Sequence, residues 1–280
     1  MRASDVIIRT LEDEGVEYIF GNPGSTELLF LESLLKSKIK YIISLHENVA
    51  MGMAEGYARA SGKIGVLNLH TVPGVANALS LLYNAWDGYV PILILAGQQD
   101  TRLLSKRPWI GGDILRLSEP FIKWGYELKS PEETFYLVKK AIREALSPPE
   151  GPVILSLPQN LLHEEAPCFE SEPARISPAK PADEDIEKAA ELINSSENPI
   201  IITGDEVSRR RAVKELLSLA EKIGSPVYEP WMGEVNFPNH HDLYMGAINI
   251  DSDDIKRLLK DKDLLISIGC LLYTSPSPRD

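Results

Sequence analysis

The sequence predicts an α/β fold: a doubly wound, mostly parallel sheet with helices on both faces, followed by a second, truncated α/β domain. Short apolar runs rich in β-branched residues alternate with longer amphipathic stretches, the pattern of strands joined by crossover helices. The length of 280 residues exceeds the roughly 100–200 residues of one typical domain. Two domains, each with its own core, are therefore expected.

The first domain is predicted over residues 1–160. Its first helix is expected to start at the capping residue Ser4, to bury Val6, Ile7 and Leu11 on one face, and to end at Gly15. A strand at 18–20 then meets a loop at 21–26 whose glycines and proline let a ligand approach the backbone. The elements that follow are a helix from near 27, a strand at 41–44, a helix at 47–61, a strand at 64–69, a helix at 74–87, a strand at 91–96, a long loop at 97–112, a segment at 121–128, a helix at 131–146 and a strand at 153–157.

Residues 161–182 are predicted to be a linker, because five prolines fall between positions 158 and 181 without sustained periodicity. A partial central α/β domain is expected over 183–272. Its predicted elements are a helix at 183–194, a strand at 200–203, a helix at 208–223, a strand at 227–228 and a strand at 263–269. The tail 273–280 carries two prolines that cannot join a strand ladder, which suggests an artificial or truncated end.

Composition and charge narrow the set of possible functions. The formal net charge of -12 argues against binding to a nucleic-acid backbone. The first residues are acidic and lack the apolar core of a signal peptide, and no run approaches membrane-spanning length. Cys168 and Cys270 lie far apart without a pairing motif, as in proteins of a reducing compartment. A cytoplasmic protein with no membrane and no nucleic-acid partner is expected.

Polar residues follow two of the predicted strands. His46 and Glu47 come just after the strand at 41–44, and His70 comes just after the strand at 64–69. In an open α/β sheet, ligands bind beyond the carboxyl ends of the strands. The apolar residues around Glu47 are expected to desolvate it and raise its pKa, which would let it exchange a proton. Spacing alone favours a simpler role, in which Glu47 only complements the positive end of its helix.

His70 can shuttle protons near neutral pH, or it can simply be hydrogen-bonded into its loop. Ser25 has no neighbouring base in the sequence, so hydrogen bonding suits it better than nucleophilic attack. No metal ligand is assigned: His46-Glu47 lacks the second histidine of H-E-x-x-H, because position 50 is alanine.

Four segments carry a resemblance to the thiamine diphosphate-dependent decarboxylase and carboligase family. They are FGNPGSTELLF at 20–30, HENVAMGMAEGYARASGK at 46–63, NLHTVPGVANA at 68–78 and PILILAGQQ at 91–99. The resemblance extends to about residue 272 and covers the pyrimidine-binding domain and the start of the central domain. Within the family the chain is most similar to benzoylformate decarboxylase, with the acetolactate synthase large subunit as a relative.

The resemblance implies roles for several residues. Glu47 would hydrogen-bond the aminopyrimidine of the cofactor and promote the tautomer that removes the thiazolium proton. His70 would be an acid/base group acting on the substrate, and Ser25 would hold the substrate carboxylate. Asn77 and the backbone of Pro23 and Gly24 would line the cofactor pocket.

The resemblance also implies thiamine diphosphate and Mg2+ as cofactors, a small-molecule 2-keto acid as substrate, and a homodimer or homotetramer with active sites between subunits. The family's Gly-Asp-Gly motif and paired asparagines, which hold the metal and the diphosphate in a C-terminal domain, do not occur. This chain alone is therefore expected to be inactive. Three functions stay open: a benzoylformate-type decarboxylase, an acetolactate synthase-like carboligase, and a non-catalytic binding module that retains the fold.

Overall fold

The computed structural model describes residues 1–177, 179–231, 233–249 and 253–270. The chain divides into two compact units, Met1–Ser177 and Pro178–Asp280. The first unit takes in most of the segment 161–182 that the sequence suggests as a linker. The predicted tail at 273–280 lies outside the described residues.

The first unit is built on one six-stranded sheet in which every strand pair is parallel. The strand order is β2-β1-β3-β4-β6-β5. The strands are β1 (Tyr18–Asn22), β2 (Lys40–Ile43), β3 (Gly65–Leu69), β4 (Ile92–Gln98), β5 (Trp124–Glu127) and β6 (Val153–Pro158). This sheet confirms the predicted α/β class.

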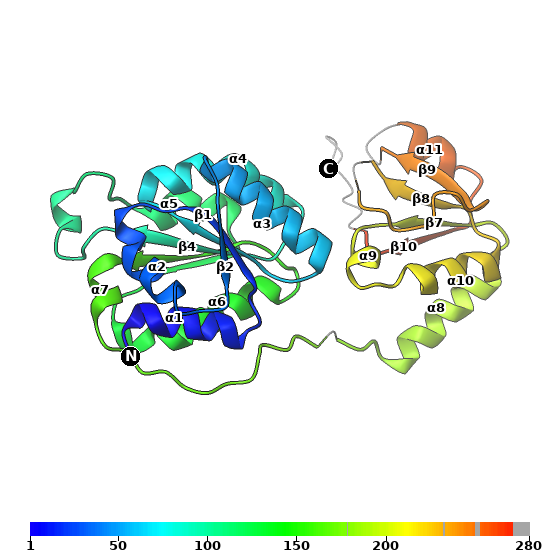
Figure 1. Ribbon diagram of the computed structural model, residues 1–280. Coiled ribbons are helices and arrows are strands. Elements are labelled where there is room, and N and C mark those ends of the chain that lie inside the picture. Colours follow the sequence, from blue (N-terminus) through cyan, green and yellow to red (C-terminus); the bar gives the residue numbers. More distant parts are fainter. Residues whose placement is uncertain (178, 232, 250–252, 271–280) are drawn as a thin grey trace. The chain divides into compact units, whose positions relative to one another are not determined.

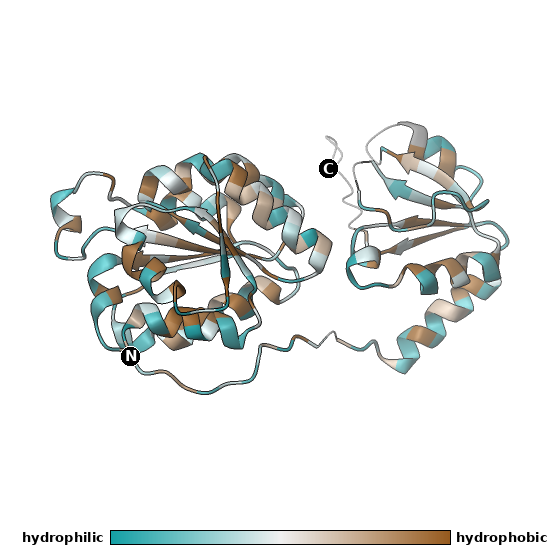
Figure 2. Ribbon diagram, viewed as in Figure 1, coloured by the Kyte–Doolittle hydropathy of each residue, from teal (hydrophilic) through white to brown (hydrophobic). Residues whose placement is uncertain are grey.

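Helices cover both faces of this sheet (Figure 1). One face carries α1 (Ala3–Asp13), α2 (Leu28–Leu34), α6 (Thr134–Leu146) and α7 (Gln159–His163); the other carries α3 (Glu47–Ser61), α4 (Thr71–Asp87) and α5 (Ile114–Ser118). Short 3-10 turns occur at η1 (Ser25–Glu27), η2 (Leu104–Lys106), η3 (Glu119–Phe121) and η4 (Pro131–Glu133). Figure 2 shows apolar residues gathered on the strands and polar residues on the outer turns of the helices.

Helix α1 has the predicted apolar face and the predicted end, but not the predicted start. Val6, Ile7 and Leu11 are fully buried, and Gly15 has a φ of 76°, the left-handed conformation that glycine adopts without strain. The N-cap is Arg2, which makes no side-chain cap bond. Ser4 lies buried inside the helix, where its hydroxyl accepts a hydrogen bond from the Ser33 hydroxyl at 2.9 Å. The prediction that Ser4 caps this helix is wrong.

Other boundaries differ for identifiable reasons. Helix α4 begins at Thr71 instead of 74, because Pro73 is tolerated in a first turn, where its missing N–H would have no helical partner. The helix predicted at 208–223 is two helices, α9 (Glu206–Arg209) and α10 (Val213–Ile223), since Arg211 adopts a φ of 58° between them. The short α5, β9 (Tyr244–Ile248) and α11 (Asp253–Leu259) were not predicted.

The second unit contains a four-stranded parallel sheet with the order β10-β7-β8-β9. Its remaining strands are β7 (Pro199–Thr203), β8 (Val227–Pro230) and β10 (Leu264–Ile268), and its first helix is α8 (Asp183–Ser195). The core is a small cluster of buried residues: Ile201, Val207, Leu216, Ala220, Val227 and Phe237. Among the residues that the structure describes, no helix in either unit is both long and apolar enough to cross a membrane.

Candidate active site at the switch point of the first sheet

The first sheet reverses its winding between β1 and β3. The chain passes from β1 to β2 on one side and then returns to place β3 on the other side of β1. The carboxyl ends of β1 and β3 lie side by side, with Asn22 in register with Leu69. At such a switch point the two outgoing loops separate and leave a crevice in which ligands bind.

Glu47 lies at this switch point as the first residue of α3. The residue is 8% exposed, and both oxygens of its carboxylate accept hydrogen bonds from side-chain amides. Asn22 Nδ2, at the end of β1, donates to Oε1 at 3.0 Å, and Asn77 Nδ2, on α4, donates to Oε2 at 2.9 Å. His46 caps the same helix, because its Nδ1 accepts the backbone N–H of Asn48 at 3.2 Å. Three elements therefore fix one carboxylate.

The pKa of Glu47 is lowered, not raised as its apolar neighbours suggested. Burial pushes the pKa upward and is the largest single effect, as predicted, but other effects together outweigh it. The Asn77 amide, the backbone N–H of Glu47, the Asn22 amide and the nearby His46 all stabilise the charged form. The predicted direction of the pKa shift was wrong, because the prediction considered the apolar residues of α3 and not the side-chain amides of Asn22 in β1 and Asn77 in α4.

His70 follows β3 and forms the N-cap position of α4. Its Nδ1 lies 2.8 Å from Oε2 of Glu27 and 3.0 Å from the hydroxyl of Thr26. The imidazole also lies against the backbone of Gly24, where an added Cβ would overlap the ring. The histidine is thus held on its Nδ1 side by the loop that follows β1.

Glu27 is a buried carboxylate, 1% exposed, at the start of α2. Its Oε2 accepts the backbone N–H of Gly24 at 2.7 Å as well as meeting His70, and its Oε1 accepts a short bond from the Thr26 hydroxyl. A carboxylate so far from water is expected to keep such partners, because an unsatisfied buried charge is very costly.

The structure places the remaining predicted site residues in the loop between β1 and α2. Pro23 and Gly24 are half-buried, and Ser25 is exposed at the first position of η1. Asn77 contacts Glu47, as described above. The predicted residues therefore gather at one end of the sheet in two groups, one around Glu47 and one around His70.

Asn22, Thr26 and Glu27 were missed by the sequence reasoning. Glu27 stands three residues after Gly24, the spacing at which a glutamate bends back to the backbone of a helix start. That spacing was visible in the sequence. Asn22 was hidden, because nothing in a single chain shows that an asparagine ending one strand faces a glutamate twenty-five residues later.

A long loop borders the same end of the sheet. It leaves β4 at Gln98, whose buried side-chain amide Nε2 donates to the backbone oxygen of Gly112 at 2.8 Å. The backbone N–H of Val72, two residues after His70, reaches the oxygen of Ile110 in this loop at 3.4 Å. Trp109 is 88% exposed beside it. The backbone of this loop therefore lies against the start of α4, next to His70 in the chain.

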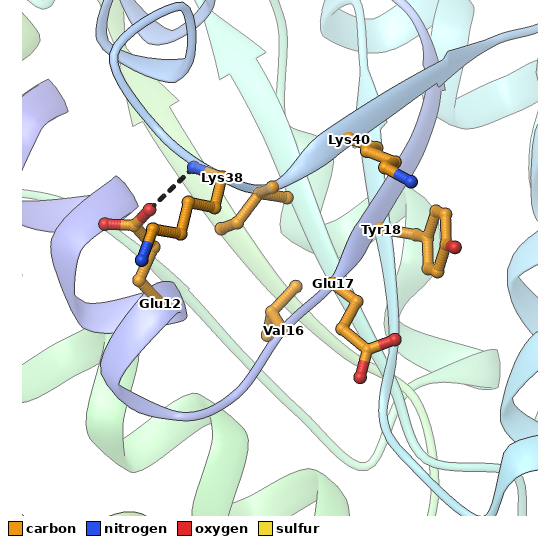
Figure 3. A pocket seen from close by; sticks show the side chains of 7 residues that line it. Glu12, Val16, Glu17, Tyr18, Lys38 and Lys40 are labelled. Carbon is orange, nitrogen blue, oxygen red and sulfur yellow. Dashed lines mark hydrogen bonds between the residues drawn. The ribbon is translucent and has the colours of Figure 1, made fainter.

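A pocket of about 410 Å3 lies elsewhere, at the amino ends of β1 and β2 (Figure 3). Its lining residues are Glu12, Val16, Glu17, Tyr18, Lys38, Ile39 and Lys40. The Glu12 carboxylate already accepts the backbone N–H of Lys38 at 2.9 Å, and Lys40 lies over the Tyr18 ring. Since parallel strands have all their carboxyl ends together, this pocket is at the opposite end of the sheet from Glu47 and His70.

Within the described ranges, no group of three or more His, Cys, Asp or Glu side chains could hold a metal ion. The ionisable groups at the switch point are engaged with one another and with amides, as set out above.

Two protein-family models match this chain. The model described as thiamine pyrophosphate enzyme, N-terminal TPP binding domain, matches residues 1–116. The model described as thiamine pyrophosphate enzyme, central domain, matches residues 186–278.

Curated relatives agree with these matches. Benzoylformate decarboxylase of Pseudomonas aeruginosa is 33% identical over 268 residues, which cover 94% of this chain and 51% of that protein. A protein named "Probable acetolactate synthase large subunit", from Methanocaldococcus jannaschii, is 34% identical over 278 residues, covering 96% of this chain and 47% of that protein. The chain thus spans about half the length of the curated relatives it matches.

The fold is matched by solved structures as well. The thiamine diphosphate-dependent 4-hydroxybenzoylformate decarboxylase of Rhodococcus jostii RHA1 superposes with a TM-score of 0.92 at 29% identity, over 99% of this chain and 53% of that one. Benzoylformate decarboxylase from Polynucleobacter necessarius gives a TM-score of 0.89 at 29% identity, over 98% of this chain and 52% of that one. Taken together, the two matched domains, the relatives and the superposed structures show that the chain belongs to the family of thiamine diphosphate-dependent enzymes.

Proposed function

We propose that this chain is the first part of a thiamine diphosphate-dependent 2-keto acid decarboxylase of the benzoylformate type. One observation carries the proposal: the switch point holds a fixed carboxylate at Glu47 and, on the neighbouring loop, a histidine whose Nδ1 is engaged by a buried glutamate. These two groups can move protons at two different places in one crevice.

The residues around Glu47 suit the pyrimidine ring of the cofactor. Each carboxylate oxygen accepts one hydrogen bond from a side-chain amide, and a remaining lone pair can accept a hydrogen bond from a protonated ring nitrogen. Asn77 contacts Glu47, and we propose that it lines the cofactor pocket together with the backbone of Pro23 and Gly24, which follow Asn22 in the chain. When bound, the cofactor supplies a thiazolium ring that can hold the electron pair released as a 2-keto acid loses carbon dioxide. We assign Mg2+ and the diphosphate to residues outside this chain.

The pKa of Glu47 is lowered, so the carboxylate is its favoured form. The ring nitrogens of a neutral aminopyrimidine carry no hydrogen, so in the proposed role Glu47 takes up a proton from water and passes it to the ring nitrogen that it faces. The carboxylate that remains accepts the hydrogen bond of that N–H group, and the two amides hold its oxygens in place.

His70 serves the substrate. With Nδ1 turned to Glu27, the other ring nitrogen, Nε2, is the one available to exchange a proton with the keto oxygen of a 2-keto acid. The exposed hydroxyl of Ser25, on the adjoining η1 turn, holds the substrate carboxylate in this proposal.

An acetolactate synthase-like carboligase is the second candidate, favoured by the 34% identity to the relative of that name. Two features favour the decarboxylase. His70 and its partner Glu27 provide an acid/base group for a substrate oxygen, and both superposed decarboxylases act, by their names, on aryl keto acids. A non-catalytic module is the third candidate, and it gives no reason for an arranged pair of carboxylates at a switch point.

Exposed apolar residues around Glu47 support an active site completed by another polypeptide segment. Leu45 is 99% exposed, Ile43 69% and Val49 55%, and all three lie within four residues of Glu47. A partner surface laid over them would remove water from the crevice. We propose a homodimer or homotetramer with active sites between subunits. The two free cysteines support our proposal of a cytoplasmic location.

Products from the complete protein, including the residues that follow this chain, test the proposal. Carbon dioxide and an aldehyde from an aryl 2-keto acid are expected; acetolactate from pyruvate would favour the second candidate instead. Absence of thiamine diphosphate binding in the presence of Mg2+ would leave only the non-catalytic module.

Two variants separate the proposed roles. Glu47→Gln keeps the shape of the side chain but cannot exchange the proton, so it is expected to fold and to lose most turnover. His70→Ala is expected to slow the substrate step while thiamine diphosphate still binds. Wild-type turnover in either variant would refute the role of that residue.

A further inference from the structure

The buried carboxylate of Glu27 needs space above the sheet that strand side chains would ordinarily fill. It lies over β4, where a Cβ built at Gly97 would overlap Oε1 and would stand 2.5 Å from the hydroxyl of Thr26. Any side chain at position 97 would therefore displace Glu27, Thr26 or both.

The backbone at Gly97 does not itself require glycine. The residue lies in a regular strand, paired in register with Leu157, and its φ is outside the left-handed region that favours glycine. Glycine within a strand lowers stability relative to residues with side chains. The space it leaves for the carboxylate is a reason for its presence that the backbone conformation does not supply.

Thr26 determines the direction of the hydrogen bonds around His70. Its hydroxyl has one proton, which it donates to Oε1 of Glu27. Only lone pairs of Thr26 are then left to face Nδ1 of His70 at 3.0 Å, and the carboxylate oxygen at 2.8 Å also accepts. Two acceptors at Nδ1 require that nitrogen to carry the proton. In the neutral ring, Nε2 then carries no hydrogen.

We propose that Gly97 and Thr26 are positioning residues for His70. They hold the Glu27 carboxylate in place, so that the neutral imidazole keeps its proton on Nδ1 and has an unprotonated Nε2 for the crevice. The tautomer follows from the contacts of Thr26 and Glu27 with Nδ1. Only its use on a substrate rests on the proposed function.

Gly97 and Thr26 contact the carboxylate of Glu27 in different ways, so separate variants can test the role of each residue. Gly97→Ala moves the carboxylate away and leaves Nδ1 without its acceptor. Thr26→Val keeps the shape of the side chain but removes both the donor to Oε1 of Glu27 and one of the two acceptors at Nδ1 of His70. The Nδ1–H form then loses part of its support.

Long-range proton–nitrogen NMR spectra of the 280-residue chain, recorded at a pH where the imidazoles are neutral, report the tautomer of each histidine. His46 and His241 are internal references of the opposite kind, because their Nδ1 atoms accept backbone N–H groups from Asn48 and Leu243. Wild type is expected to show the Nδ1–H form at His70 and the Nε2–H form at the two references.

Gly97→Ala is expected to convert His70 largely to the Nε2–H form, Thr26→Val to raise the share of that form to a smaller extent, and Thr26→Ser, which restores the hydroxyl, to return the wild-type spectrum. Gly56→Ala is the control, since no atom lies within 4 Å of a Cβ there. A wild-type His70 spectrum in folded Gly97→Ala or in Thr26→Val would overturn the role of that residue.

If Gly97→Ala does not fold, a second change keeps the proposal testable. Shortening the acid in Gly97→Ala with Glu27→Asp withdraws the carboxylate from β4, so the double variant is expected to fold better than the single one. Equal instability of both would contradict the steric argument. A changed tautomer with unchanged turnover of a 2-keto acid by the complete protein would instead refute the use of His70 in the proposed reaction.

Discussion

Replacing Asn77 by alanine tests how the carboxylate of Glu47 is held. The change removes one of two amide donors, the one that bonds Oε2 at 2.9 Å. A hydrogen bond to a charged group contributes about 1.5–3 kcal/mol to stability. Asn77 is exposed, so water can partly replace its amide, and we expect the low end of that range, about 1.5 kcal/mol at neutral pH.

The loss should depend on pH in a defined direction. The pKa of Glu47 in the folded chain is below its ordinary value of 4.5. Its ionisation therefore stabilises the fold above pH 4.5, and this contribution is lost as the pH falls through the lower folded value. Asn77→Ala removes part of the cause of the lowered pKa. The stability curves of wild type and variant should therefore approach each other in acid.

Denaturant unfolding at a series of pH values measures this difference. Asn84→Ala is the matched control, because Asn84 is exposed on the same helix, α4, and the change gives the same gain in helix propensity without touching Glu47. Carbon NMR of the Glu47 carboxyl should show its pKa raised in Asn77→Ala and unchanged in Asn84→Ala. Equal stability of the two variants at every pH would show that the amide does not hold the carboxylate.

Three further changes test other parts of the structure. Tyr41→Phe removes the hydroxyl that donates to Asn68 at 3.1 Å, and should cost about 1 kcal/mol in denaturant unfolding. Burial, aided by the Glu27 charge, raises the pKa of Tyr41 above 10, so stability should fall as the pH rises past 10, and less so in the variant. Glu14→Gln weakens the buried pair with Lys139 and should destabilise the first unit by about 3 kcal/mol. Ile201→Ala, in the core of the second unit, should cost about 2–5 kcal/mol, read from the exchange protection of β7 amides; unchanged protection would place Ile201 outside the core.

The regular elements of the first unit were predictable because each has a strong local pattern. Strand β4 is a continuous apolar run, and helix α3 is bounded by the His46 cap and by Gly62 with a φ of 69°. Where a boundary depended on tertiary contacts, the local rule failed. Ser4 looks like a helix cap, yet its hydroxyl is recruited by Ser33 of another helix. The short β9 was missed because a half-buried strand of five residues has little signal of its own.

The site was predictable as a place but not as a set of contacts. Strand ends locate Glu47 and His70 at one edge of the sheet, and this needs only the order of strands and helices. The environment of each group comes from residues distant in sequence. Asn22 and Asn77 reverse the direction in which burial moves the pKa of Glu47, and Glu27 decides which nitrogen of His70 is engaged.

The switch point holds two carboxylates in different surroundings. Glu47 is held by two side-chain amides that donate to its oxygens, and in the proposed function it exchanges a proton with the cofactor. Glu27 is enclosed by Gly24, Thr26 and His70, and the imidazole is its titratable hydrogen-bond partner. In the proposed function, the first therefore serves the cofactor and the second positions a histidine. Because β1 supplies Asn22 to one group and its following loop supplies Glu27 to the other, a single strand end fixes the geometry of both.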